Sequence, residues 1–224
     1  METAQRLQQS IAADDRATAC ALVDADPGLL DGEIAGGASA ILLALYMGKR
    51  ELAQDFAQRK PRLAITEAAA LGHGDALLAA LAADPAVANT RSGDGFPALG
   101  LAVFFGHLKC AALLLGAGAD ANTPAANPMR VAPIHSACAR SDEAQACALA
   151  QLLIAFGADP NLQQQAGWTP LHAAAHRDQA RLIRLLRAAG GDPSLRNDTG
   201  VDPVALATSE GRHAALAALL ATVA

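Results

Sequence analysis

Apolar and polar residues alternate at helical spacing in short stretches along the whole chain. The pattern is clearest between residues 169 and 189, where a polar turn separates two such stretches. The first has a narrow face of small residues, which lets a neighbouring helix approach closely, and the second has a broader apolar stripe. These faces are Leu171, Ala174 and Ala175 in the first stretch, and Leu182, Ile183, Leu185 and Leu186 in the second. The pattern predicts two short helices that need further helices to cover them.

Residues at the ends of these stretches carry the signals of helix starts and stops. Gly167 permits a tight turn, Thr169 is a residue type that caps helices, and Pro170 suits a first helical turn. We expect the second helix to stop at Gly190 and Gly191, because glycine tolerates the left-handed conformation that ends many helices. The segment therefore predicts a turn, a short helix and a second helix in that order.

This helix pair is one copy of a repeat with a period of 33 residues. Pro170 and Pro203 are 33 positions apart, and so are Asp159 and Asp192. Other copies lie upstream: they are residues 95–122, residues 132–139 and two weaker stretches that begin at Gly37 and Ala64, preceded by one more helix pair. Self-similarity at a fixed period predicts a stack of like units.

The best-preserved copies are TPLHAAA at Thr169–Ala175, GADPN at Gly157–Asn161 and GHLKCAALLLGAGADAN at Gly106–Asn122. The pattern resembles the ankyrin repeat, a 33-residue unit with a T-P-L-H-x-A signature. The resemblance implies an all-α solenoid of about seven stacked helix-turn-helix units, forming a single domain over residues 1–224. The expected units are 1–36, 37–62, 63–94, 95–130, 131–166, 167–199 and 200–224, the first and last being caps.

One unit is longer than the others. Asp120 and Asp159 are 39 positions apart, six more than the period. About two of the extra residues fall in the loop Asn122–Val131, and four fall near Arg140–Gln145, between the expected helices. Insertions in repeat proteins fall in loops and often lie on a binding face. A binding role and neutral drift both remain open for the first insertion, and drift is favoured for the second.

The last expected helix, His213–Ala224, is apolar almost all round. A terminal unit normally has a polar outer face. Three explanations stay open: the protein continues, this end packs on another chain, or its small alanines make the patch tolerable. We favour the third and expect a monomer, with self-association through this helix as the alternative.

His172 and His176 have the spacing of two zinc ligands on one helix face. The pair lacks the intervening glutamate of H-E-x-x-H and any obvious third ligand. His135 occupies the position of His172 one unit earlier, and such recurrence is typical of a structural residue. In the ankyrin pattern this histidine bonds to polar groups of the turn. We therefore expect no metal and no cofactor.

Other functional classes find little support in the sequence. The formal net charge of −5 argues against a nucleic-acid binder, and no apolar segment is long enough to span a membrane. Motifs for a serine nucleophile, a P-loop or a dinucleotide site are missing, so no enzymatic activity is expected. The four scattered cysteines are expected to be reduced and buried. The start of the chain lacks a secretory pattern, which favours the cytoplasm, and the alanine-rich, lysine-poor composition is typical of high-GC bacterial genes.

The resemblance implies that partner proteins bind the loops between units, called fingers below, and the exposed face of each first helix. Candidate contacts are the last residues of each first helix, the residue after each turn glycine and the lengthened loop. They are Tyr46, Met47, Leu71, Phe96, Phe104, Phe105, Met129, Arg130, Arg140, Trp168, His176 and Arg177. Five of the seven aromatic residues fall in this set, and aromatic residues are enriched at protein interfaces.

The candidate face would run from an apolar end near Tyr46 and Phe104 to a basic end at Arg140, His176 and Arg177. Such a gradient indicates a partner segment with an apolar anchor and an acidic end. Packing against a neighbouring unit is an equal alternative for Phe104 and Phe105, whereas contact with a partner is favoured for Trp168.

The sequence therefore predicts a protein–protein interaction module or scaffold. An inhibitor or regulatory subunit of an enzyme is the alternative within the same class. A metal-dependent hydrolase that uses His172 and His176 is the alternative from another class. The sequence does not identify the partner.

Overall fold

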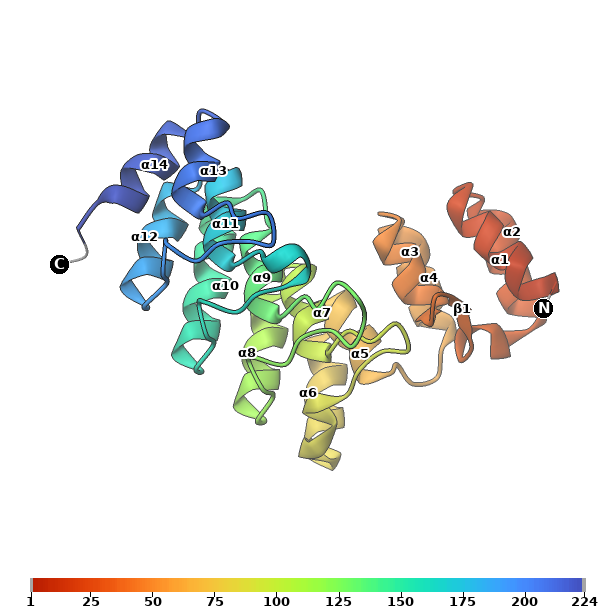
Figure 1. Cartoon of the computed structure of the whole chain (residues 1–224). Helices are drawn as coiled ribbons and strands as arrows, with labels where there is room; N and C mark the ends of the chain where they lie inside the picture. The colour runs from red at the N-terminus through yellow and green to blue at the C-terminus, as the bar shows by residue number, and fades with distance from the viewer. Residues whose placement is uncertain (1, 223–224) are drawn as a thin grey trace.

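The computed structural model describes residues 2–222, and these residues form fourteen α-helices packed in seven consecutive pairs. The first helices of the pairs are α1 (Glu2–Ala12), α3 (Ala40–Tyr46), α5 (Ile65–Leu71), α7 (Ala98–Phe104), α9 (Pro133–Cys138), α11 (Pro170–His176) and α13 (Pro203–Ser209). The second helices are α2 (Arg16–Ala25), α4 (Arg50–Arg59), α6 (Gly74–Ala83), α8 (Leu108–Gly116), α10 (Glu143–Ala155), α12 (Ala180–Ala188) and α14 (His213–Leu220). The predicted all-α stack of about seven helix pairs is confirmed (Figure 1).

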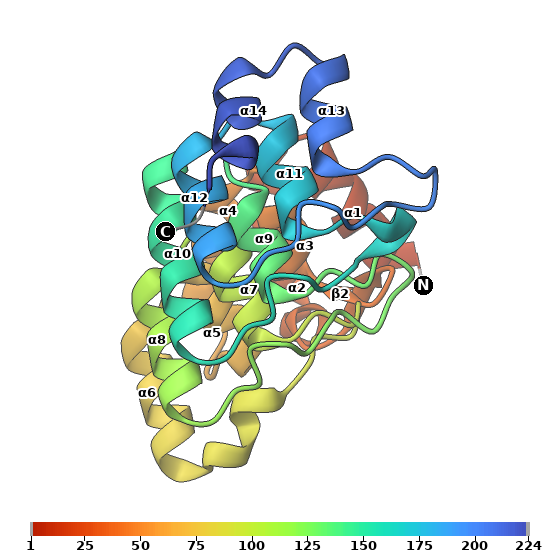
Figure 2. The same cartoon turned by 60° about the vertical axis from the view of Figure 1, so that its left-hand side comes forward.

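Five long loops of 14 to 16 residues join successive pairs, and they form the fingers. They carry the short elements of the fold: the 3₁₀ helices η1 (Pro27–Leu30), η2 (Pro85–Asn89) and η3 (Gln165–Gly167), and a hairpin of β1 (Glu33–Ala35) with β2 (Ala38–Ser39). Figure 2 shows the fingers before α9, α11 and α13 on the same side of the stacked helices. The finger tips and the first helices thus share one face of the molecule.

The linker between α4 and α5 is different, because it has only five residues, 60–64, and no finger. The fingers on either side of it come together: a side chain on Gly37 of the β1–β2 hairpin would lie 2.4 Å from the carbonyl oxygen of Gly93. Away from the fingers, a cavity of about 430 Å³ opens between α4 and α6. The stack changes direction at this linker, which Figure 1 shows between α4 and α6.

The apolar core divides at the same place. One cluster of buried side chains extends from α5 to α14, between Ile65 and Leu219. The other is built on α1 to α4, between Leu7 and Ala57, and receives Ala70, Leu71 and Leu101 from across the linker. The short linker therefore separates an N-terminal body of two helix pairs from a C-terminal body of five pairs.

A buried ion pair occupies the linker where a finger would lie. Lys60 Nζ lies 3.0 Å from Glu67 Oε2, and the two side chains are only 9% and 2% exposed. The ammonium group also donates to the carbonyl oxygen of Leu30 at 2.9 Å, and Glu67 accepts from the Ala64 N–H at 2.9 Å. Because every strong donor and acceptor has a partner, the pair is tolerated in a buried position.

An asparagine at the same place in three successive fingers links each unit to the next. The Asn122 side chain donates to the carbonyl oxygen of Gly157 at 2.8 Å and accepts from the N–H of Asp159 at 2.7 Å. Asn89 forms the same two bonds with Gly118 and Asp120, and Asn161 forms them with Gly190 and Asp192. Ser194 takes this place in the following finger, and its hydroxyl donates to Asp192 within its own turn. We call the three asparagines the asparagine ladder.

Replacing Asn122 with alanine should lower the free energy of unfolding by about 1–2 kcal/mol, because two hydrogen bonds at a partly solvated site are lost. Urea denaturation followed by circular dichroism measures the change. Asn122→Asp keeps the acceptor for the Asp159 N–H and loses only the donor to Gly157, so it should fall between wild type and alanine. Equal stability of all three proteins would contradict a structural role for the ladder.

The second insertion forms a helical turn, and the expectation that it lies between the helices is wrong. Helix α10 has 13 residues, whereas α8 and α12 have nine each. The extra turn is at the N-terminal end of α10, where Asp142 accepts hydrogen bonds from Ala144 and Gln145. It places the Glu143 carboxylate 2.7 Å from the backbone nitrogen of Arg181, in the first turn of α12. The added residues therefore cap the next unit.

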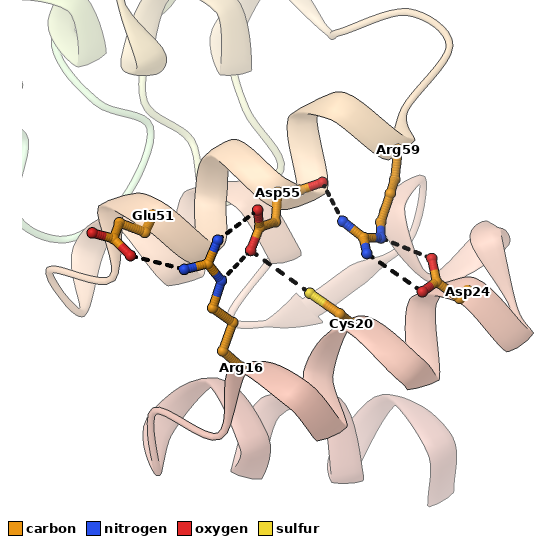
Figure 3. A network of polar contacts seen from close by, with 6 residues as sticks. All are labelled: Arg16, Cys20, Asp24, Glu51, Asp55 and Arg59. Carbon is orange, nitrogen blue, oxygen red and sulfur yellow. Dashed lines mark hydrogen bonds and ion pairs between the residues drawn. The ribbon is translucent and has the colours of Figure 1, made fainter.

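A network of ion pairs joins the first helix pair to the second on the side of α2 and α4 (Figure 3). Arg16 binds Asp55 through two nitrogens and Glu51 through a third, at 2.8 Å. Arg59 binds Asp24 at 2.7 Å, and its guanidinium lowers the pKa of that carboxyl group. The Cys20 thiol lies within the network, 3.8 Å from Asp55. These contacts fix the N-terminal cap to the stack.

Helix α14 ends the described part of the stack. Its eight residues bury Ala215, Ala218 and Leu219, whereas Leu220 is exposed. Arg187 of the preceding unit donates to the carbonyl oxygens of Ala218 and Ala221 and so caps the helix end. Within residues 2–222, every helix is too short or too polar to cross a membrane.

Candidate functional site

The predicted contact residues lie at the C-terminal ends of the first helices and on the finger tips. Tyr46 and Met47 end α3, Phe104 and Phe105 end α7, and His176 and Arg177 end α11. Met129 and Arg130 lie on the finger before α9, and Phe96 and Trp168 lie on the fingers before α7 and α11. Arg140 follows α9, and Leu71 ends α5.

Four aromatic side chains form a cluster across the junction of the two bodies. The ring of Tyr46 stacks on Phe105 at a centroid distance of 5.9 Å and meets Phe96 at 6.3 Å. Phe104 and Phe105 pack edge to face at 5.0 Å. The Tyr46 hydroxyl donates to Asp94 at 2.8 Å, and burial together with this carboxylate raises the pKa of the phenol. The cluster therefore joins the end of α3 to the end of α7 and to the finger before α7.

Burial divides the cluster into packing residues and exposed residues. Phe96 and Phe105 pack against the N-terminal core and are half-buried. Tyr46, Met47 and Phe104 keep 36%, 41% and 49% of their surfaces exposed. An apolar surface from three neighbouring large side chains is therefore open to solvent.

Leu71 does not belong to this exposed surface. Its side chain is only 8% exposed and packs in the N-terminal core together with Ala70, at the end of α5. The expectation that Leu71 faces a partner is corrected accordingly.

The basic end of the expected gradient is weaker than the sequence indicates. The Arg140 guanidinium donates to the carbonyl oxygen of Phe104 at 2.6 Å and also binds Gln145. Burial lowers the pKa of Arg140, whose group caps the end of α7. His176 lies 2.8 Å from Glu210, and this bond lowers the pKa of the carboxyl group. The side chains of Arg140 and His176 are thus already occupied within the chain.

Arg130 and Arg177 are candidate basic residues whose guanidinium groups form no ion pair within residues 2–222. Both are exposed. Each adjoins an apolar contact, since Arg130 follows Met129 and Arg177 follows His176, whose ring lies 6.0 Å from that of Trp168. The free positive charge of the face is therefore located around Met129 and Trp168.

A small cavity of about 250 Å³ lies between the finger before α9 and the finger before α11. Its lining comes from both loops and is mostly apolar: Met129, Val131, Gln164, Gln165, Ala166 and Trp168. Met129 is 50% exposed at its edge. We call this feature the Met129–Trp168 pocket.

Both ring nitrogens of His172 form hydrogen bonds within the chain, so this side chain has a structural role. Nδ1 accepts from the Thr169 N–H at 3.2 Å, and Nε2 donates to the carbonyl oxygen of Val201, in the next unit, at 3.0 Å. His135 repeats this arrangement with Ala132 and Leu162. His172 therefore has no nitrogen available to join His176 on a metal. In the described part of the chain, no three His, Cys, Asp or Glu side chains are grouped as metal ligands would be.

The cysteines divide into three buried side chains and one that is partly exposed. Cys110, Cys138 and Cys147 are buried, and burial raises the pKa of each thiol. Cys20, in the ion-pair network, is partly exposed, so the expectation of four buried thiols is wrong at this position. A raised pKa keeps a thiol protonated and unreactive, as expected of a structural residue.

Two family models match the chain. One, described as ankyrin repeats in three copies, matches residues 134–223, and the other, described as an ankyrin repeat, matches residues 94–126. The chain belongs to the ankyrin repeat family. Ankyrin repeats are generally protein–protein interaction modules and typically have no catalytic role. A search of curated proteins gives no match to this chain.

The matched ankyrin repeats begin at residue 94, directly after the fingerless linker and the unit that follows it. In that unit Glu67 takes the position of the ankyrin histidine and bonds the same N-terminal turn through Ala64. Its second partner is Lys60, in the preceding linker, whereas His135 and His172 bond the next finger. The unit that departs from the ankyrin sequence pattern is thus the one whose residue at this position bonds backward to the preceding linker and not forward to the next finger.

Several residues of the candidate surface escaped the sequence reasoning. Gln164, Gln165 and Ala166 line the Met129–Trp168 pocket, and Asp94 holds Tyr46. The ankyrin spacing places these residues on fingers, but it does not say which fingers touch. The one available signal is Val131, which ends the lengthened loop at the position that Trp168 occupies in the next ankyrin repeat.

Proposed function

We infer that this ankyrin repeat chain is a protein–protein interaction module, and that its partner binds the first-helix ends and the finger tips. One observation carries the proposal. Of the eight large apolar side chains that are exposed within residues 2–222, four lie on this single face: Tyr46, Met47, Phe104 and Met129. Aromatic and methionine side chains are enriched at protein interfaces and supply many of their dominant contacts.

The arrangement offers no comparable support for the metal-dependent alternative. His172 is fully buried, with both nitrogens bonded, and His176 is paired with Glu210. A nucleophile or base in an enzyme must reach its substrate from an open cavity. The exposed apolar surface is the feature that needs an explanation, and a bound protein supplies one.

Partner capture tests the proposal with two matched variants. Phe104→Asp places a charge on the candidate face, whereas Leu108→Asp places one on a similarly exposed apolar residue at the start of α8, outside the predicted contact set. The full chain is cross-linked in extracts of its source organism, and captured proteins are quantified by mass spectrometry. We expect Phe104→Asp to lose the captured partner by about tenfold, which corresponds to about 1.4 kcal/mol, and Leu108→Asp to retain it.

Circular dichroism and urea denaturation must first show that both variants are folded. Equal capture by wild type and Phe104→Asp would overturn the proposed face. Equal loss in both variants would show that capture follows general surface hydrophobicity and would also overturn it.

A further inference from the structure

The Met129–Trp168 pocket is held in shape by contacts that do not involve a partner. The Gln165 N–H donates to the carbonyl oxygen of Met129 at 3.0 Å and joins the two fingers. The Trp168 ring lies 5.7 Å from the ring of His172, which is itself buried and bonded on both sides. A pocket fixed in this way loses little conformational entropy when it is filled.

The backbone at the pocket edge is unusual. Arg130 and Ala166 have φ angles of 49° and 63°, in the left-handed region, and they are two of the four non-glycine residues with positive φ in the described chain. Such conformations persist where the surroundings enforce them, and they concentrate at binding sites. Both lie on the fingers that form the pocket.

The pocket is small and mostly apolar. A volume of about 250 Å³ is below the range of about 300–1,000 Å³ that is typical of small-molecule and cofactor sites. It suits one bulky side chain, such as leucine, isoleucine, methionine or phenylalanine. Gln164 and Gln165 are the polar residues of its lining.

Charge around the pocket favours an acidic partner. Arg130 and Arg177 are exposed and free of ion pairs within residues 2–222. The carboxylate of Glu210 is occupied by His176 and Arg212. Asp198, beside Gly167, is the opposing carboxylate near the second finger. Asp178, directly after Arg177, accepts a hydrogen bond from the Ala215 N–H. Arg130 and Arg177 therefore supply the unpaired positive charge of the rim, which attracts carboxylates.

We propose that the Met129–Trp168 pocket takes one bulky apolar side chain from a partner segment whose flanking residues are acidic. The proposal rests on the inferred interaction function and names the kind of segment that this part of the face binds. The apolar side chain fills the space beside Trp168, and the carboxylates bind Arg130 and Arg177. The basic end of the apolar-to-basic face expected from the sequence therefore lies at Arg130 and Arg177 in this proposal, and Arg140 is not part of it.

Trp168 makes the pocket directly observable, because it is the only tryptophan of the chain. A phage-displayed library of random short peptides without tryptophan is selected on the full chain. Each selected peptide is then synthesised and titrated against the protein while the emission of Trp168 is recorded. We expect enrichment of peptides with Asp or Glu on both sides of one bulky apolar residue, and a shift of Trp168 emission to shorter wavelength on binding.

Three variants assign the binding to the pocket. Arg130→Glu changes an exposed charge at the rim, and Met129→Ser removes an apolar wall, so each should weaken the selected peptides by about tenfold. Arg62→Glu changes another exposed arginine, in the fingerless linker, and should leave the affinity as in wild type. Replacing the acidic residues of a peptide with lysine should abolish its binding.

Other results would overturn the inference in distinguishable ways. Enrichment of basic or neutral peptides would overturn the acidic chemistry. Peptides that leave Trp168 emission unchanged and lose affinity on Phe104→Asp would overturn the pocket and still support the proposed face. Enrichment of no peptide would overturn the inference, and the capture experiment with Phe104→Asp and Leu108→Asp would then decide the proposed function by itself.

Discussion

Replacing Glu67 with alanine should lower the free energy of unfolding by about 3–5 kcal/mol. The change leaves the buried Lys60 ammonium with only the Leu30 carbonyl oxygen and the exposed carboxylate of Asp31. It also removes the acceptor of the Ala64 N–H at the start of α5. An uncompensated charge in a buried site is among the most destabilising changes that a single substitution can make. Urea denaturation at neutral pH measures the loss.

The double variant Lys60→Met with Glu67→Leu is the matched control. It removes both charges, and Leu42 shows that leucine is accepted at the equivalent position of the preceding unit. Replacing a buried ion pair by apolar residues of similar size is often neutral or stabilising, so we expect recovery of most of the loss. A loss below about 1 kcal/mol in Glu67→Ala would show instead that water reaches Lys60 and that the pair contributes as little as a surface ion pair.

Acidification should destabilise the protein well before its carboxylates are protonated. Burial lowers the pKa of His135 to about 4 from its ordinary value of 6.5, and burial also lowers the pKa of His172. The neutral imidazole is the folded form, so its contribution is fully present above pH 6.5. It is lost as the pH falls from 6.5 to about 4, because the unfolded state then binds a proton that the folded state does not. A difference of this size for His135 corresponds to about 3 kcal/mol.

Urea unfolding at about pH 7.5 and about pH 4.5 tests this expectation, since most of the histidine effect falls between these two values. The carboxyl groups with lowered pKa, such as Asp24, Asp55 and Glu210, contribute their losses mainly at lower pH. A His135→Gln variant should be less stable at neutral pH, and its stability should fall less between the two pH values. The same fall in wild type and variant would show that His135 is not the responsible group.

The sequence was sufficient for the architecture and for the role of the histidines. Both predictions rest on recurrence: Pro170 and Pro203 set the period, and His135 repeats His172. A residue that reappears once per unit must satisfy the same local geometry each time, and the bonds of both histidines confirm this. Recurrence is informative because every unit faces the same two neighbours.

The sequence was insufficient wherever one unit differs from the others. The linker 60–64 lacks a finger, and no periodic signal says that Lys60 then binds Glu67. Arg140 has the position of a contact residue, yet its guanidinium reaches back to Phe104 in the preceding unit. The extra turn of α10 was easier to predict from the sequence, because Glu143, Ala144 and Gln145 are good helix formers that favour helix over loop.

The asparagine ladder has a consequence for how this protein can change in length. Asn89, Asn122 and Asn161 each meet the same pair of backbone atoms in the following unit, so a duplicated or deleted unit would find matching partners above and below. The junction at Lys60 and Glu67 occurs once and has no such interchangeable copy. A unit between Asn89 and Ser194 can therefore be added or removed with these hydrogen bonds retained, whereas the junction at Lys60 and Glu67 offers no second copy to pair with.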